Sequence, residues 1–116
     1  MLFGQVVAAE RRELGHRFLV AYLKGVRDWV DAMDRNKGRE QVIDVMMQYT
    51  PLQDRTLFDD MRPAGLNPDG YIDLDSIARD VRWYADNGYV DRLIDVGTIV
   101  DHGFVDCALG VLGRYE

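Results

Sequence analysis

Residues 10–35, ERRELGHRFLVAYLKGVRDWVDAMDR, contain the strongest structural pattern of the chain. Their apolar side chains recur every three or four positions, which is the spacing of residues on one face of a helix. These positions are Leu14, Phe18, Leu19, Tyr22, Leu23, Val26, Trp29, Val30 and Met33. The pattern predicts a helix over residues 10–35 that ends at Asn36, Lys37 and Gly38. Its apolar face is wider than a surface helix needs, so we expect neighbours on two sides.

A second helical pattern follows directly, over residues 39–49. This helix should end before Pro51, because a residue that precedes proline is pushed out of the α region. The side chains expected to be buried are Val42, Val45, Met46 and Tyr49. Asp54 is a candidate cap for a short helix that runs to Met61.

Residues 62–70, RPAGLNPDG, form the longest turn-rich stretch, with two prolines that restrict φ and two glycines that permit positive φ. A helix is predicted after it over residues 74–87, with Asp73 or Asp75 as its N-cap and Gly88 as its terminator. Its expected buried stripe is Leu74, Ile77, Val81, Tyr84 and Ala85.

The C-terminal region contains one more helix signal. Residues 89–100 are ambiguous, and Asp101 then suits the N-cap of a last helix that ends at Gly113. The apolar positions of this helix are Phe104, Val105, Ala108, Leu109, Val111 and Leu112. We therefore expect a mainly α fold of about five helices.

Length and composition fit one helical domain over residues 1–116. A chain of 116 residues with 47% apolar side chains has enough material for one core. Cys107 is the single cysteine, which excludes an internal disulfide bond.

The chain is acidic, with a formal net charge of −6 and a pI of about 4.8. Binding to nucleic acid or to an anionic membrane needs clustered basic residues, so we expect neither partner. No apolar run approaches the roughly 18 residues of a membrane span, so no membrane insertion is expected. Residues 1–10 lack the basic start and apolar run of a secretory signal, and the sequence as written predicts a cytoplasmic chain.

Residues 65–76, GLNPDGYIDLDS, share part of the spacing of an EF-hand calcium loop. The matching positions are Asn67, Asp69, Gly70 and Ile72. Gly65 stands where the first acidic ligand belongs, and Ser76 replaces the bidentate glutamate. We therefore expect a turn followed by a helix cap here, and no metal site.

A nucleophile, a base and acids occur together only in Asp101, His102, Asp106 and Cys107. Residues five apart on a helix lie about 140° apart in projection, so His102 and Cys107 should point to different faces. Cys107 is interpreted as a small buried core residue. We expect no catalytic residues and no enzymatic activity.

Cofactor motifs are absent from the sequence. Two histidines, His16 and His102, and one cysteine do not provide the ligand spacing of a zinc site. No glycine-rich phosphate loop follows a strand pattern. No metal or cofactor is expected.

Six aromatic side chains could build a ligand-binding wall, although core packing is the favoured interpretation for them. They are Tyr22, Trp29, Tyr71, Trp83, Tyr84 and Tyr89. Trp29 and Tyr84 lie on stripes already assigned to the core.

Several segments together resemble the C-terminal part of substrate-binding proteins of ABC importers. The resemblance is to the family that binds sulfonates, nitrate, taurine and pyrimidine-type thiamine precursors. It is carried by residues 17–29 (RFLVAYLKGVRDW), 65–77 (GLNPDGYIDLDSI), 93–96 (LIDV) and 99–109 (IVDHGFVDCAL), which stand in the family's order.

The resemblance implies a parent protein with the type 2 periplasmic-binding fold, in which a ligand cleft closes between two α/β lobes. This chain would supply only its C-terminal helical part, with residues 1–7 near the end of a hinge-region strand. The ligand-contacting residues of the family come mostly from earlier strands, so the ligand-binding residues here are unknown. The parent would be periplasmic or otherwise extracytoplasmic.

Three functional interpretations follow. The first is the C-terminal portion of an importer's solute-binding protein, whose partners are a small organic or anionic nutrient and the ABC permease. The alternative is a stand-alone helical protein derived from that family, acting as a dimeric interaction or regulatory module. The third is a small enzyme that uses Asp101, His102 and Cys107, or a related pyrimidine-precursor enzyme. The wide apolar face of the first helix predicts a homodimer for the isolated chain.

Overall fold

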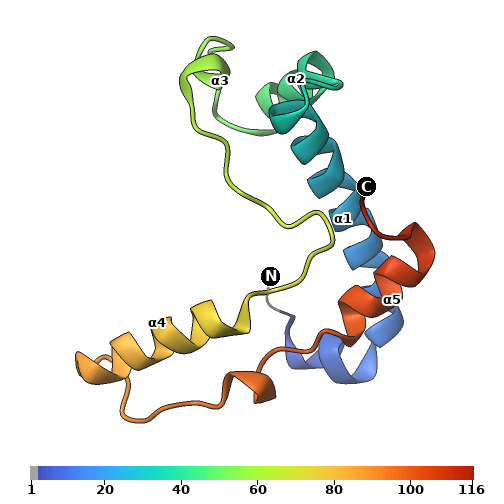
Figure 1. The fold of residues 1–116 in the computed structure, drawn as a ribbon. Coiled ribbons are helices and arrows are strands. Elements are labelled where there is room, and N and C mark those ends of the chain that lie inside the picture. Colours follow the sequence, from blue (N-terminus) through green and yellow to red (C-terminus); the bar gives the residue numbers. More distant parts are fainter. Residues whose placement is uncertain (1–2) are drawn as a thin grey trace.

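The computed structural model describes residues 3–116, and within this range it is mainly helical and contains no strand (Figure 1). The long helices are α1 (Arg12–Asp34), α2 (Arg39–Tyr49), α4 (Leu74–Asp86) and α5 (Gly103–Leu112). The shorter elements are α3 (Leu57–Asp60), a π-helical turn η1 (Val6–Glu10) and a 3₁₀ turn η2 (Val96–Thr98). The mainly α fold of about five helices is thus confirmed.

The expectation that residues 1–7 end a hinge-region strand is wrong for residues 3–7. Residues 3–7 form no strand, because the chain coils into the η1 turn from Val6 onward. Met1 and Leu2, the first residues of that expected strand, lie outside the described residues.

The main core lies where α5 packs along the N-terminal half of α1 (Figure 1). Its buried residues are Leu19, Leu23, Phe104, Val105 and Ala108. The two helices approach closely at Gly15, where an added Cβ would lie 2.6 Å from Cε1 of Phe104. The absence of a side chain at this position therefore lets the Phe104 ring rest on α1.

A second buried group lies at the other end of α1, where α2 crosses it. Val30 of α1, Ile43 of α2 and Phe58 of α3 are all buried. Arg39 joins α2 to α3 by donating to the Phe58 carbonyl at 2.5 Å and to Asp59 Oδ1 at 3.0 Å. Arg55 pairs with Glu40 and Asp44 on the exposed side of α2.

The wide apolar face of α1 is covered over only part of its width. Leu19, Leu23, Val26 and Val30 are buried, whereas Leu14, Phe18 and Tyr22 are 49%, 52% and 43% exposed. The expectation of cover on two sides is wrong for these three residues, because no described element lies over them.

The predicted buried face of α2 is also wrong. Ile43 is the buried residue of this helix, whereas Val45 and Tyr49 are 54% and 76% exposed. The helix ends as predicted, since Thr50 is extended before Pro51.

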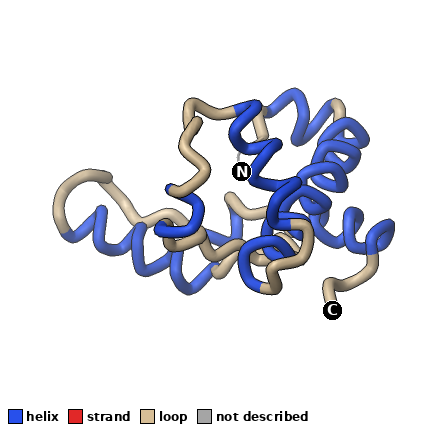
Figure 2. The backbone as a smooth tube through the Cα atoms, turned by 90° about the horizontal axis from the view of Figure 1, so that it is seen from above, coloured by secondary structure: helices blue, strands red, loops and turns tan. Residues whose placement is uncertain are grey.

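Helix α4 begins and ends as predicted, but its apolar stripe is not buried. Asp73 Oδ1 accepts hydrogen bonds from the Asp75 and Ser76 amides, and Gly88 has a φ of +73°. None of the residues of α4 is buried, because it projects away from α1 and packs mainly on η2 (Figures 1 and 2). The assignment of Leu74 and Tyr84 to a core is therefore wrong.

Removing the α4 cap should loosen this helix without disturbing the rest of the fold. Asp73→Ala is expected to cost about 1 kcal/mol of local stability, the usual loss on removing an N-cap. Hydrogen exchange of the amides over residues 75–86 should then accelerate roughly fivefold. Asp73→Asn is the matched control, since asparagine caps equally well. Equal exchange rates in the two variants would show that the cap does not stabilise α4.

Residues 3–116 form an extended structure that is less compact than a typical domain of this length. Its radius of gyration is 17.1 Å, against about 13 Å for a compact domain of this length. Its accessible surface is 8662 Å², against about 6,450 Å² for a monomeric protein of 13.3 kDa. An excess of about 2,200 Å² is therefore left in solvent, by the same size relation.

Candidate functional site

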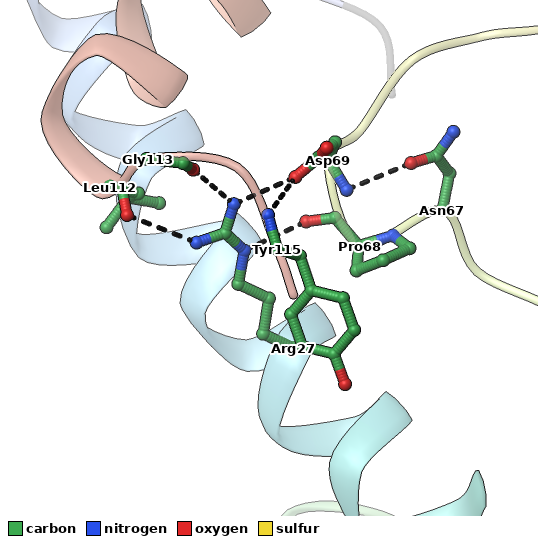
Figure 3. A network of polar contacts seen from close by, with 7 residues as sticks. All are labelled: Arg27, Asn67, Pro68, Asp69, Leu112, Gly113 and Tyr115. Carbon is green, nitrogen blue, oxygen red and sulfur yellow. Dashed lines mark hydrogen bonds and ion pairs between the residues drawn. The ribbon is translucent and has the colours of Figure 1, made fainter.

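The densest polar network in the described chain is centred on Arg27 of α1 (Figure 3). Its Nη2 donates to Asp69 Oδ1 at 2.9 Å and to the Gly113 carbonyl at 2.7 Å. Its Nε donates to the Pro68 carbonyl at 3.0 Å, and Nη1 lies 3.5 Å from the Leu112 carbonyl. Arg27 thereby joins α1, the turn at residues 67–70 and the end of α5.

The turn at residues 67–70 is preorganised by its own sequence. Asn67 Oδ1 accepts from the Asp69 amide at 2.9 Å, and the Gly70 amide donates to the Asn67 carbonyl. Gly70 has a φ of +79°, and an added Cβ would lie 2.7 Å from Cδ2 of Leu23. Glycine is thus required here both for the backbone conformation and for the contact with α1.

The C-terminal residues fasten onto the same network. The Tyr115 amide donates to Asp69 Oδ1 at 2.9 Å, and its hydroxyl donates to Asp31 Oδ1 at 2.6 Å. Arg35 donates to the Glu116 carbonyl and lies over the Tyr115 ring, 4.7 Å from its centroid. Residues 113–116 are therefore held along α1.

The hydrogen bond from the Tyr115 hydroxyl to Asp31 shifts the pKa of both side chains. It lowers the pKa of Asp31, to which Lys37 also contributes, and it raises the pKa of Tyr115. The stabilisation linked to Asp31 is present above its ordinary pKa of 3.8 and is lost as the pH falls. The stabilisation linked to Tyr115 is complete below its ordinary pKa of 10.0 and is lost as the pH rises.

Tyr115→Phe should therefore flatten the alkaline part of the stability profile. Wild-type protein is expected to lose more free energy of unfolding than the variant between about pH 9 and about pH 11, because only the wild type loses this phenolic hydrogen bond. Urea unfolding at a series of pH values measures the difference. Parallel pH profiles for the two proteins would contradict a contribution from this bond.

Most of the donors of Arg27 are used within the chain. Its side chain and that of Asp69 are each only 16% exposed, and its donors already face four oxygen atoms within the chain. The network is thus a clamp between segments. The sequence pattern placed Arg27 on the polar face of its helix, and nothing near it in sequence indicated Asp69 as its partner.

The resemblance to a calcium loop does not extend to the side chains. Asp69 pairs with Arg27, Asp73 caps α4, and the Asn67 side chain is used within its own turn. The predicted turn and helix cap are both observed. Among residues 3–116, no group of three or more His, Cys, Asp or Glu side chains is placed to hold a metal ion.

The candidate thiol cluster, which consists of Asp101, His102, Asp106 and Cys107, does not form one site. Its side chains contact separate partners. Asp101 accepts from the Gly103 amide at 2.8 Å and pairs with Arg12 at 3.0 Å, and both contacts lower its pKa. Asp106 accepts from the Tyr71 hydroxyl at 2.7 Å, which raises the pKa of Tyr71. The His102 ring lies edge-on to Tyr71, with its Nε2 buried and unbonded among the described residues.

Cys107 is exposed, so its assignment to the core is wrong. Phe104, Val105 and Ala108 form the stripe of α5 that meets α1, and Cys107 lies beside that stripe where no described element covers it. His16, the other histidine, packs edge-on against Phe104 with ring centroids 5.0 Å apart.

The exposure of Cys107 predicts fast modification in the folded state. Ellman's reagent should react with the native protein within about tenfold of the rate in denaturant, because an accessible thiol needs no opening of the fold. Cys107→Ser supplies the blank. A reaction slowed by a hundredfold or more would mean that the thiol is covered.

An apolar groove of about 1090 Å³ lies between α1, α2 and the loop after α3. Its apolar lining includes Tyr22, Trp29, Val42, Val45, Met46 and Leu66. The predicted aromatic wall therefore contributes two members here, Tyr22 and Trp29. The groove explains why the apolar side chains of α2 are not in a core.

Three of the other four aromatic residues gather at the far end of α4, whereas Tyr71 packs on His102. Trp83 and Tyr89 stack with centroids 5.8 Å apart, and Tyr84 meets both rings edge-on. Their exposed fractions are 55% for Trp83, 49% for Tyr84 and 69% for Tyr89. These three residues, here called the aromatic cluster, form an exposed surface, and a single aromatic wall of six residues does not exist.

No protein-family model, curated protein or solved structure matches the chain in comparisons with known proteins. None of the helices within residues 3–116 is both long and apolar enough to cross a membrane. The assignment of a function therefore depends on the chain's own residues and contacts.

Proposed function

We propose that this chain is the C-terminal portion of the solute-binding protein of an ABC importer, which captures a small organic or anionic nutrient for uptake. The observation that carries the proposal is the Arg27 clamp. Arg27 lies in residues 17–29, Asp69 lies in residues 65–77, and Gly113 follows residues 99–109. Arg27 thus binds two of the four segments that resemble the importer family to each other and to the residues that follow the last one.

The open shape supports the same proposal. Leu14, Phe18 and Tyr22 on α1 are largely exposed within residues 3–116, as are Leu74 and Tyr84 of the apolar stripe of α4. In a two-lobed binding protein these faces would pack against the lobes. The role of the segment is then structural, and ligand capture proceeds by closure of the lobes before delivery to the permease.

The proposal implies a non-catalytic protein that works outside the cytoplasm. It assigns no ligand-binding residue to this chain, because the polar atoms of the Arg27 network already bind one another and the lining of the groove is mainly apolar. Binding of the nutrient would require the lobes.

DNA sequencing upstream of the Met1 codon tests the proposal. We expect the reading frame to continue through strands, a second lobe and a signal peptide. Calorimetric titration of that longer protein with sulfonates, nitrate and aminopyrimidines should then reveal one tight ligand. An upstream in-frame stop codon, followed by a ribosome-binding site for Met1 itself, would overturn the proposal.

A second candidate is a stand-alone dimeric interaction module. The excess surface of about 2,200 Å², estimated from the size relation for monomeric proteins, favours it. A cooperative unfolding transition of the isolated 116-residue chain that depends on protein concentration would support this function. A chain that unfolds without cooperativity at every concentration would exclude it.

A further inference from the structure

We propose that two copies of this chain exchange arms, with the aromatic cluster of one copy seated in the α1/α2 groove of the other. The arm is α4 with the loop to Ile94, and its end carries Trp83, Tyr84 and Tyr89. The inference goes beyond the importer proposal and concerns the isolated chain, in which no lobes cover Tyr22 and α4.

The two surfaces are both mainly apolar and exposed. The groove is open, and its volume of about 1090 Å³ lies just above the roughly 300–1,000 Å³ usual for a small-molecule pocket. The aromatic cluster lies at the end of the projecting α4 (Figure 1) and is continued by Leu93 and Ile94, which are 59% and 46% exposed. Tyrosine and tryptophan are the side chains most enriched at binding hot spots.

The arm does not fill the groove of its own chain. Helices α2 and α4 lie at opposite ends of the molecule, and α4 packs mainly on η2 (Figure 1). Residues 67–73 connect the lining of the groove to the arm and lead away from α2 (Figure 1). A second copy supplies the missing contact without any refolding of the first.

The area agrees with a stable dimer. A fully exposed aromatic side chain buries about 150–250 Å², so the three side chains of the aromatic cluster, at 55%, 49% and 69% exposure, offer about 260–430 Å² together. If the groove loses a similar area, two such contacts hide about 1,000–1,700 Å² in total, which overlaps the standard size of stable interfaces. The excess surface of the chain, about 2,200 Å² per copy, is large enough to supply this area.

Reciprocal exchange also limits the assembly to two copies. Each chain offers one arm and one groove, and a two-fold axis lets both contacts form at once. A single contact without that symmetry would leave an arm and a groove free at each end and produce open polymers.

Two sets of substitutions test the contact at exposed positions, where the fold is not at risk. The arm variant is Trp83→Ser with Tyr89→Ser, and the groove variant is Val45→Asp, a position that is 54% exposed. Tyr49→Asp is the matched control, because Tyr49 lies on α2, is 76% exposed and does not line the groove.

Light scattering after gel filtration, over a range of concentrations, measures the assembly. We expect wild type and Tyr49→Asp to be dimers, and the arm and groove variants to dissociate at concentrations at least tenfold higher than wild type. An equimolar mixture of the two variants should recover mixed dimers, because one intact arm then meets one intact groove. Circular dichroism confirms that each variant retains wild-type helicity.

Three results would overturn the inference: a wild-type chain that is monomeric at every concentration, a mixture that stays monomeric, or assembly into open polymers. Failure of the arm exchange is distinct from failure of the importer proposal. The upstream reading frame decides the importer proposal, whereas the molar mass of the assembly decides the arm exchange.

Discussion

Replacing Arg27 with methionine is expected to lower the free energy of unfolding by about 2–3 kcal/mol, somewhat less than the roughly 3–5 kcal/mol for breaking a fully buried ion pair, because Arg27 and Asp69 are each still 16% exposed. The guanidinium supplies donors to Asp69 and to the Pro68 and Gly113 carbonyls. Methionine retains the length of the side chain and none of these donors. Asp69 then keeps only the Tyr115 amide among the partners described outside its own turn.

Urea unfolding followed by circular dichroism measures the loss. Arg17→Met is the matched control, because Arg17 lies on the same helix, is exposed and makes no ion pair among residues 3–116. Arg27→Lys should be intermediate, since an ammonium group cannot reproduce the planar fork of the guanidinium. If Arg27→Met and Arg17→Met cost the same, the clamp does not stabilise the fold.

Phe104→Ala is expected to have the other large effect, a loss of about 3–5 kcal/mol, which is typical for removing a buried aromatic ring. Phe104 is 5% exposed and packs on Gly15, His16 and Phe3, with Arg12 over its ring at 4.3 Å. Few other buried side chains join α1 to α5, so the cavity cannot be compensated elsewhere.

Thermal and urea unfolding measure this loss as well. Val111→Ala, on the same helix and 69% exposed, is the control and should change stability by less than about 0.5 kcal/mol. Phe104→Leu should recover part of the loss, because it refills most of the cavity with apolar atoms. If the Phe104→Ala protein is as stable as the Val111→Ala protein, Phe104 does not belong to the core that stabilises the fold.

The helices and their ends follow from short-range physics that the sequence displays directly. The spacing of apolar residues predicted α1, α2, α4 and α5 to within a few residues. Asp73 accepts from the first amides of α4, Gly88 supplies a positive φ, and Pro51 keeps Thr50 extended. Each of these effects acts within about one helical turn, so neighbours in sequence suffice to predict it.

Burial within those helices could not be predicted in the same way. Leu19, Leu23, Val26 and Val30 form one row along α1, and Leu14, Phe18 and Tyr22 form the row beside it. Both rows are equally apolar and equally periodic. Only the positions of α5 and α2 decide which row is buried. Those positions depend on contacts between residues that are distant in the sequence.

The candidate site shows the same division between local and distant contacts. The turn at residues 67–70 was predictable, since Asn67, Pro68 and Gly70 favour a turn wherever they occur together. Its partner Arg27 was not, because Pro68 lies 41 positions after Arg27 in the sequence. The exposure of Cys107 and the separation of the aromatic residues into a groove and an arm were missed for the same reason.

Residue order and chemistry alone therefore determined that this protein is helical, where its helices start and stop, and that its central loop turns at Asn67. The tertiary structure decided which apolar faces are covered, that Arg27 clamps three segments, and that a groove and an aromatic arm remain open. The physical reason is the range of the forces. Hydrogen bonds of caps and turns join close neighbours, whereas burial depends on which distant surfaces meet.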